Sequence, residues 1–193
     1  MSDKTKAELP TLSFANQAEW RAWLEAEHAT SNGVWLKLAK KATGIASVNR
    51  AEALDEALCF GWIDGQAKPI DEQFWLQKFS PRTKKSTWSK VNRDHIERLT
   101  AAGLMHAAGE AEVERAKADG RWDAAYDSPK NAAIPEDFQA ALDASPTAAN
   151  FFATLKQTQR YPFLFRIQTA KKPETRAKRI RDFVATLERG ETL

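Results

Sequence analysis

The sequence contains a single cysteine, Cys59, among its 193 residues. A lone thiol excludes a disulfide framework within the chain and every zinc or iron–sulfur pattern that needs several cysteines. The three histidines have no metal-ligand spacing, so we predict neither a metal nor a cofactor. No apolar run approaches the roughly 20 residues that cross a bilayer, and the polar start of the chain has no secretory signal. We therefore expect a cytoplasmic protein with no membrane span.

Charge of one sign is not in large excess either, because 29 Lys and Arg face 26 Asp and Glu, a net charge of +3. The charges are nevertheless uneven, with nine basic residues and one acidic residue in the segment 156–181. This segment can attract a polyanion such as nucleic acid, or it can pair with the acid-rich segment 110–143 of the same chain. Both interpretations stay open at this point.

Hydrophobic periodicity and capping signals predict an α+β fold, a small antiparallel sheet with helices followed by a helical C-terminal subdomain. The alternating pattern predicts a strand over 34–39, and shorter extended segments are expected at 62–65 and 74–79. Helices are predicted over 16–28, 49–61, 90–102, 110–118, 136–144, 146–157 and 173–190.

The same pattern divides the chain into four parts. We predict a flexible N-terminal tail over 1–12, an α+β domain over 13–120, a packed linker over 121–134 and the helical subdomain over 135–193. The linker assignment depends on Gly120, on the Asp-Ser-Pro turn at 127–129 and on weak periodicity between them.

Two segments carry the residues that are best suited to chemistry. In Leu58-Cys59-Phe60-Gly61-Trp62-Ile63-Asp64-Gly65, the thiol is expected to be a buried hydrophobe rather than a nucleophile. Asp64 is either a turn residue or structural ion-pair partner, or a partly desolvated carboxylate of a site. In the segment 79–93, Arg82 offers a guanidinium beside hydroxyls, Trp88 and a predicted helix start. These are parts of an anion site, although solvated lysines and a capping Ser89 explain the same pattern.

Several motifs together resemble one protein family. GVWLKLAKK, EALDEALCFGWIDG, FSPRTKKSTWSKVN, DGRWDAAY and RY…AKKPETRAKRI are similar in order and content to the YdeI/OmpD-associated family of bacterial proteins, also labelled bacteriocin-protection proteins. The resemblance runs from about Phe14 to Gly190. It implies an α+β N-terminal part, a helical C-terminal part and a role in stress or bacteriocin resistance, with association to a porin. It implies no catalytic residue.

The resemblance places its motif residues in one window around the predicted helix start. We hypothesise that they form a pocket for a small anionic or nucleotide-like ligand, in which Asp64 and Arg82 pair and a tryptophan forms a stacking wall. The residues of this hypothetical pocket are Trp62, Asp64, Arg82, Ser86, Trp88, Ser89 and Asn92.

The function expected from these observations is that of a non-catalytic binding or stress-protection protein. One alternative is an enzyme for a small anionic substrate, with Asp64 as acid or base and Arg82 holding the anion. A second alternative is a nucleic-acid binder that uses the basic C-terminal helix. A protein partner is a further possibility, and the sequence does not give the oligomeric state.

Overall fold

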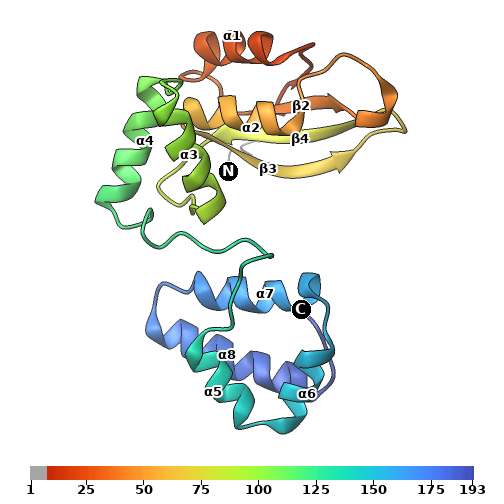
Figure 1. The fold of residues 1–193 in the computed structure, drawn as a ribbon, viewed down its shortest axis with the longest axis vertical. Helices are drawn as coiled ribbons and strands as arrows, with labels where there is room; N and C mark the ends of the chain where they lie inside the picture. Colours follow the sequence, from red (N-terminus) through yellow and green to blue (C-terminus); the bar gives the residue numbers. More distant parts are fainter. Residues whose placement is uncertain (1–7) are drawn as a thin grey trace, which may run out of the picture. The chain divides into compact units, whose positions relative to one another are not determined.

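The computed structural model describes residues 8–193, which form two compact units. The first unit extends to residue 86 and includes residues 92–122, and the second comprises 87–91 and 123–193. Eight α-helices and one four-stranded sheet occur in the described chain, which confirms the α+β class (Figure 1).

The sheet of the first unit has the strand order β1-β2-β4-β3. The strands are β1 (Thr11–Leu12), β2 (Val34–Ala39), β3 (Trp62–Pro69) and β4 (Phe74–Pro81). β4 is antiparallel to both of its neighbours, as predicted, whereas β1 runs parallel to β2. The predicted tail therefore contains a short strand at its end, and its residues 1–7 lie outside the described residues.

Alternation along β2 separates the two faces of this sheet. Val34, Leu36 and Leu38 are buried, while Trp35 and Lys37 between them are only half-buried. This is the period of two that the sequence predicted for a strand with one face toward the core.

Helices α1 (Gln17–Glu27) and α2 (Arg50–Cys59) lie on the core side of the sheet (Figure 1). The Trp20 indole joins them, because its Nε1 donates to the Ala53 carbonyl at 3.0 Å and its ring centroid lies 5.7 Å from that of Phe79 on β4.

Both helices begin at the predicted asparagine caps. Asn16 accepts from the Glu19 amide, and Asn49 forms a complete capping box with Glu52. Capping by a side chain satisfies amide groups that a helix start otherwise leaves unpaired.

Helices α3 (Lys90–Ala101) and α4 (Ala107–Ala118) follow, and α4 approaches the end of α2 very closely. A methyl group built on Gly109 would lie 2.1 Å from the carbonyl oxygen of Cys59. Gly61 has a φ of 73° and a methyl group there would lie 3.0 Å from the Ala108 carbonyl oxygen. Both glycines are therefore needed at this junction, one for space and one for space and conformation.

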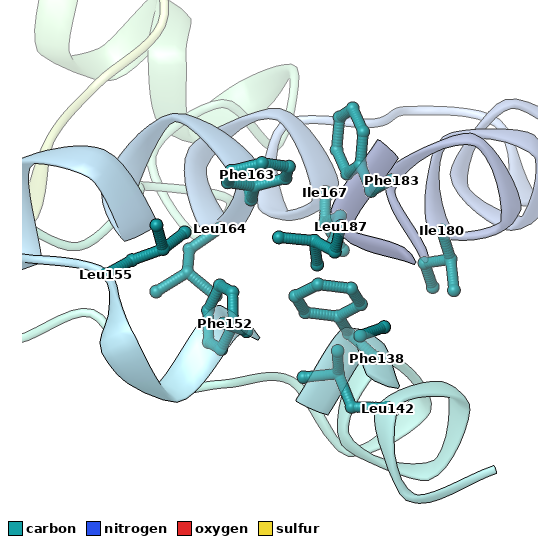
Figure 2. Close-up of a cluster of buried hydrophobic side chains, with 11 residues drawn as sticks. Phe138, Leu142, Phe152, Leu155, Phe163, Leu164, Ile167, Ile180, Phe183 and Leu187 are labelled. Atoms are coloured by element: carbon teal, nitrogen blue, oxygen red, sulfur yellow. The ribbon is translucent and has the colours of Figure 1, made fainter. Parts of the chain in front are cut away.

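The second unit contains α5 (Glu136–Asp143), α6 (Pro146–Thr154), α7 (Gln157–Gln168) and α8 (Pro173–Glu188). Their apolar faces meet in one core, and Figure 2 shows phenylalanine and leucine side chains from all four helices converging there. The fully or nearly buried rings of this core are Phe138, Phe152, Phe163 and Phe183.

Helix α7 is the one helix that the periodicity did not predict. It carries Pro162 in its interior, and proline removes a backbone donor and crowds the preceding turn. The buried side chains Phe163, Leu164 and Ile167 pack α7 into the core, so tertiary packing outweighs the local penalty.

Candidate functional site

A cleft of about 540 Å³ in the first unit lies beside the start of α2. Among the described residues, its lining contains three cations and no acid. The residues that line it are Ala39, Lys40, Lys41, Ile45, Ser47, Asn49, Arg50, Ala51 and Trp75. A cleft with this lining has a positive potential and favours an anionic occupant.

The path of the chain explains why these cations gather. β2 ends at Ala39 and is followed by the short 3-10 turn η1 (Lys41–Thr43), after which Gly44 adopts a φ of 66°. The loop then returns to Asn49, where α2 begins. The end of a strand and the start of the next helix are thereby placed side by side.

The backbone amides at the start of α2 are already engaged. The Asn49 carboxamide oxygen accepts from the amides of Ala51 and Glu52, at 2.9 and 3.1 Å. An anion in the cleft would therefore be held mainly by side-chain cations rather than by free helix amides.

The positive charge of Arg50 is partly neutralised by a carboxylate of the sheet. Its Nη2 lies 2.6 Å from Oδ2 of Asp64 on β3. Among the described residues, no acceptor contacts its Nε or Nη1, so these donors remain available to a ligand. Arg50 is 55% exposed on its side chain, which keeps it accessible from solvent.

Lys40 and Trp75 define the opposite part of the cleft. The Lys40 ammonium donates to the Asp71 carbonyl at 2.9 Å, which fixes the stem beside the β3–β4 turn. Asp71 itself accepts from the amides of Gln73 and Phe74, and these hydrogen bonds hold its pKa below the ordinary value. Trp75 is half-buried and provides the flat apolar wall.

Two residues of the predicted pocket lie on β3. Trp62 is 1% exposed, and its indole Nε1 donates to the His28 carbonyl at 3.2 Å. Asp64 pairs with Arg50, as described above. Asp64 therefore belongs to the surroundings of the cleft, whereas Trp62 is a core residue.

Three further predicted residues, Arg82, Ser86 and Asn92, also belong to the first unit. Arg82 is 5% exposed, and its amide donates to the Gly61 carbonyl at 3.0 Å. The Ser86 hydroxyl accepts from the Thr83 amide at 2.9 Å, which closes a tight turn after β4. Asn92 is a half-buried residue of α3.

Arg121 is a buried residue that the sequence analysis missed in this region. Its Nη1 donates to the Ser86 carbonyl and to Oε1 of buried Glu112, both at 3.1 Å. Its Nε also pairs with Asp119 at 2.8 Å. A buried guanidinium with several acceptors stabilises the turn after β4, and the DGRWDAAY motif supplies it.

The remaining two predicted residues, Trp88 and Ser89, belong to the second unit. Trp88 is 1% and Ser89 is 8% exposed. The Trp88 carbonyl accepts from the Tyr126 amide, and the Lys90 amide donates to the Tyr126 carbonyl. The seven predicted residues are thus divided between the two units, and their joint role as a pocket stays a prediction.

Cys59 is buried, as the sequence analysis expected. Burial, together with the nearby Glu56 carboxylate, raises the pKa of its thiol to about 11. Since the thiolate is the reactive form, this environment suppresses nucleophilic character.

One acid–base pair lies between α2 and α3. Nδ1 of His95 is 2.7 Å from Oδ1 of Asp55, and Arg98 pairs with the same carboxylate at 2.6 Å. The guanidinium pairs with the carboxylate, and the three side chains together form a hydrogen-bonded network that connects α2 and α3.

Within residues 8–193, no group of three or more histidine, cysteine or acidic side chains is arranged to hold a metal ion. The same residues contain no helix with the length and apolarity required to cross a bilayer.

The basic helix α8 forms ion pairs within the second unit. Arg176 pairs with Asp137 at 2.6 Å, and Lys178 pairs with Asp182 at the same distance. Part of the positive charge that the sequence shows in 156–181 is therefore neutralised locally.

One local signal in the sequence points to the cleft. The Lys40-Lys41 pair directly follows a predicted strand, and Arg50 directly follows a predicted helix cap. A short strand–loop–helix connection brings these positions together, but only the structure shows that Trp75 of a later strand completes the wall.

The comparisons with known families concern the two parts of the chain separately. In class, the chain is an α+β protein with a four-stranded sheet and a helical second unit. It belongs to the family described as a domain of unknown function (DUF8412), whose model matches residues 12–112, just over half of the chain. Residues 131–190 match the family model described as bacteriocin-protection, YdeI or OmpD-associated. No curated protein and no solved structure matches the chain.

The resemblance to the YdeI/OmpD-associated family is thereby confirmed, with its match in the helical second unit. The segments FGWIDG and FSPRTKKS fall within the other family match. The roles of the residues in these segments must consequently be argued from their geometry.

Proposed function

We propose that this protein binds a small anionic ligand, with an aromatic or other flat part, in the cleft beside the start of α2. One observation carries the proposal: Lys40, Lys41 and Arg50 converge on a cleft of about 540 Å³ that Trp75 also lines. A volume of this size suits a small molecule, since ligand pockets are usually about 300–1,000 Å³.

The chemistry of the lining supports a nucleotide-like or aromatic carboxylate ligand. The two lysines and the unpaired donors of Arg50 provide charge-assisted hydrogen bonds to phosphate or carboxylate oxygens. The indole of Trp75 offers a surface on which a planar group can stack. We propose binding rather than catalysis, because the one hydroxyl among the described lining residues, that of Ser47, donates to the Val48 carbonyl at 3.0 Å and accepts from the Ala39 amide at 3.2 Å.

The biological setting that we propose is stress or bacteriocin protection in the bacterial cytoplasm. The description of the family model that matches residues 131–190 supports the bacteriocin-protection part of this proposal, and the stress role and the cytoplasmic location are proposed from the sequence. Loss of protection in a strain that carries a cleft variant, with normal protein levels, would connect the binding to the phenotype.

The direct test is a thermal-shift and calorimetric titration with inorganic phosphate, adenosine monophosphate and benzoate. A ligand at about 100 times its dissociation constant adds roughly 2.7 kcal/mol of stability. For a chain of this length, that is an increase in Tm of about 5–10 °C.

Lys40→Gln/Lys41→Gln should abolish the increase in Tm. The matched control is Lys84→Gln/Lys85→Gln, which removes the same charge from exposed positions after β4. Trp75→Leu should reduce the affinity for adenosine monophosphate roughly 5- to 150-fold and leave the affinity for inorganic phosphate unchanged. The proposal would be refuted if the control variant lost the ligand-induced increase in Tm to the same extent, or if Lys40→Gln/Lys41→Gln retained it in full.

A further inference from the structure

The side of the sheet opposite α1 and α2 carries a distinct set of residues. The register pairs Trp35 with Lys78 and Lys37 with Leu76, and it pairs Lys68 with Leu76 from the other side. Phe74 follows the same alternation at the end of β4. We call this surface the basic sheet face, and it consists of Trp35, Lys37, Lys68, Phe74, Leu76 and Lys78.

Two contacts confirm that these residues share one surface. The Lys37 ammonium lies 4.0 Å from the ring centroid of Phe74, and the Lys68 ammonium lies 4.2 Å from that of Trp35. Lys68 reaches Trp35 from two strands away, across β4. The two rings therefore lie under cations on the surface of the sheet.

The basic sheet face carries charge of one sign only. Of the described strand residues on this side, three are lysines and none is acidic. Asp64 lies on the other side, where it pairs with Arg50 of α2. Lys68 is exposed, and the other five residues are partly exposed.

We propose that the basic sheet face binds single-stranded nucleic acid. Its lysines would contact phosphates, and bases would stack on Trp35 and Phe74 once the lysines turn from the rings toward the backbone. Sheets that present aromatic rings beside cations provide this combination of stacking and charge. This proposal goes beyond the small-ligand cleft, which lies on the helix side of the sheet.

Charge and geometry favour this occupant over the alternatives. A second copy of the same face would oppose lysine with lysine, which costs free energy. An acidic protein would satisfy the lysines but would not use two adjacent aromatic rings as stacking surfaces. A duplex presents phosphates but keeps its bases stacked inside, so it also leaves the rings unused.

The experiment measures the binding of the full chain to a fluorescently labelled ten-nucleotide oligothymidine by anisotropy at several salt concentrations. Trp35→Leu should weaken binding roughly 5- to 150-fold, the range that stacking of one base provides. Lys37→Gln/Lys68→Gln should reduce the slope of log affinity against log salt by about 1.4, since each phosphate contact on a single strand contributes about 0.7.

Three controls make the result specific. Lys84→Gln/Lys85→Gln removes the same charge and should leave both affinity and slope unchanged. Arg50→Ala, in the small-ligand cleft, should also leave oligonucleotide binding unchanged, which separates this proposal from the previous one. Circular dichroism and the Tm of each variant establish that it is folded.

Several outcomes would overturn the proposal. The first is that the protein does not bind oligothymidine at low salt. The second is that it binds a duplex with the same affinity and that Trp35→Leu has no effect. The third is that Lys84→Gln/Lys85→Gln reduces the affinity as much as Lys37→Gln/Lys68→Gln does. Competition by polyglutamate as effective as competition by oligothymidine would assign the face to an acidic protein. A dimer in solution that Trp35→Leu converts to monomer would assign it to a second copy.

Discussion

Gly109→Ala tests the close approach of α4 to the end of α2 in the first unit. Alanine normally stabilises a helix interior by about 1 kcal/mol relative to glycine. Here, however, the added methyl group would lie 2.1 Å from the Cys59 carbonyl oxygen, 2.7 Å from its carbon and 2.9 Å from the Met105 methyl group. Helix propensity therefore predicts that the substitution stabilises the protein, whereas packing predicts that it destabilises the protein.

The clash should outweigh the propensity. The Met105 side chain can rotate away, but the Cys59 carbonyl belongs to the backbone at the end of α2 and cannot. Relief requires α4 to move away from α2 by more than 1 Å, which opens the buried contacts between them. Overpacking of this kind costs about 1–3 kcal/mol, and more where backbone must shift. After subtraction of the helix gain, we expect a net loss of about 2 kcal/mol.

Urea denaturation and thermal melting provide the assay. A loss of this size lowers Tm by about 4–8 °C in a chain of this length. Gly65→Ala is the control, because its nearest neighbour atom would lie 3.7 Å away, at ordinary contact distance. A Gly109→Ala variant as stable as the parent, or more stable, would refute this account of the α2–α4 junction.

Two further predictions concern titratable groups. The Arg176 guanidinium holds the pKa of Asp137 below its ordinary value, so the stabilisation from this pair is complete above about pH 4 and is lost as the pH falls through the lower folded value. Between about pH 4 and 2, the Tm of Asp137→Asn should therefore fall less steeply than the Tm of the parent protein. Parallel curves of Tm against pH for the two proteins would contradict this. Because the pKa of the Cys59 thiol is raised to about 11, it should react with iodoacetamide at pH 8 only after unfolding, and rapid labelling of the native protein would disprove its burial.

Local patterns were sufficient to predict most of the fold. Asparagine caps at 16 and 49, alternation at 34–39 and proline at the starts of α6 and α8 are short-range signals, and the structure confirms the elements that they predict. Helix α7 was missed because Pro162 is unfavourable locally and the compensating contacts of Phe163 come from distant helices.

The candidate site was harder to predict for the same reason. Asp64 was identified as a possible ion-pair residue, and the structure pairs it with Arg50, a partner that the sequence analysis did not name. The cleft combines a strand end, a helix start and Trp75 from β4, and no local pattern shows that these positions converge. Likewise, the sheet register was required to show that Lys68 lies over Trp35.

The assignment of residues 87–91 to the second unit affects how this architecture can be inherited. The segment is encoded in the middle of the first unit, yet it holds Tyr126 through two backbone hydrogen bonds and Asp127 through Lys90 at 2.7 Å. A recombination event near residue 122 would transfer the helical unit without the peptide that completes it. The DUF8412 match over residues 12–112 includes this segment, so the two family matches are separate along the sequence whereas the two units are interleaved.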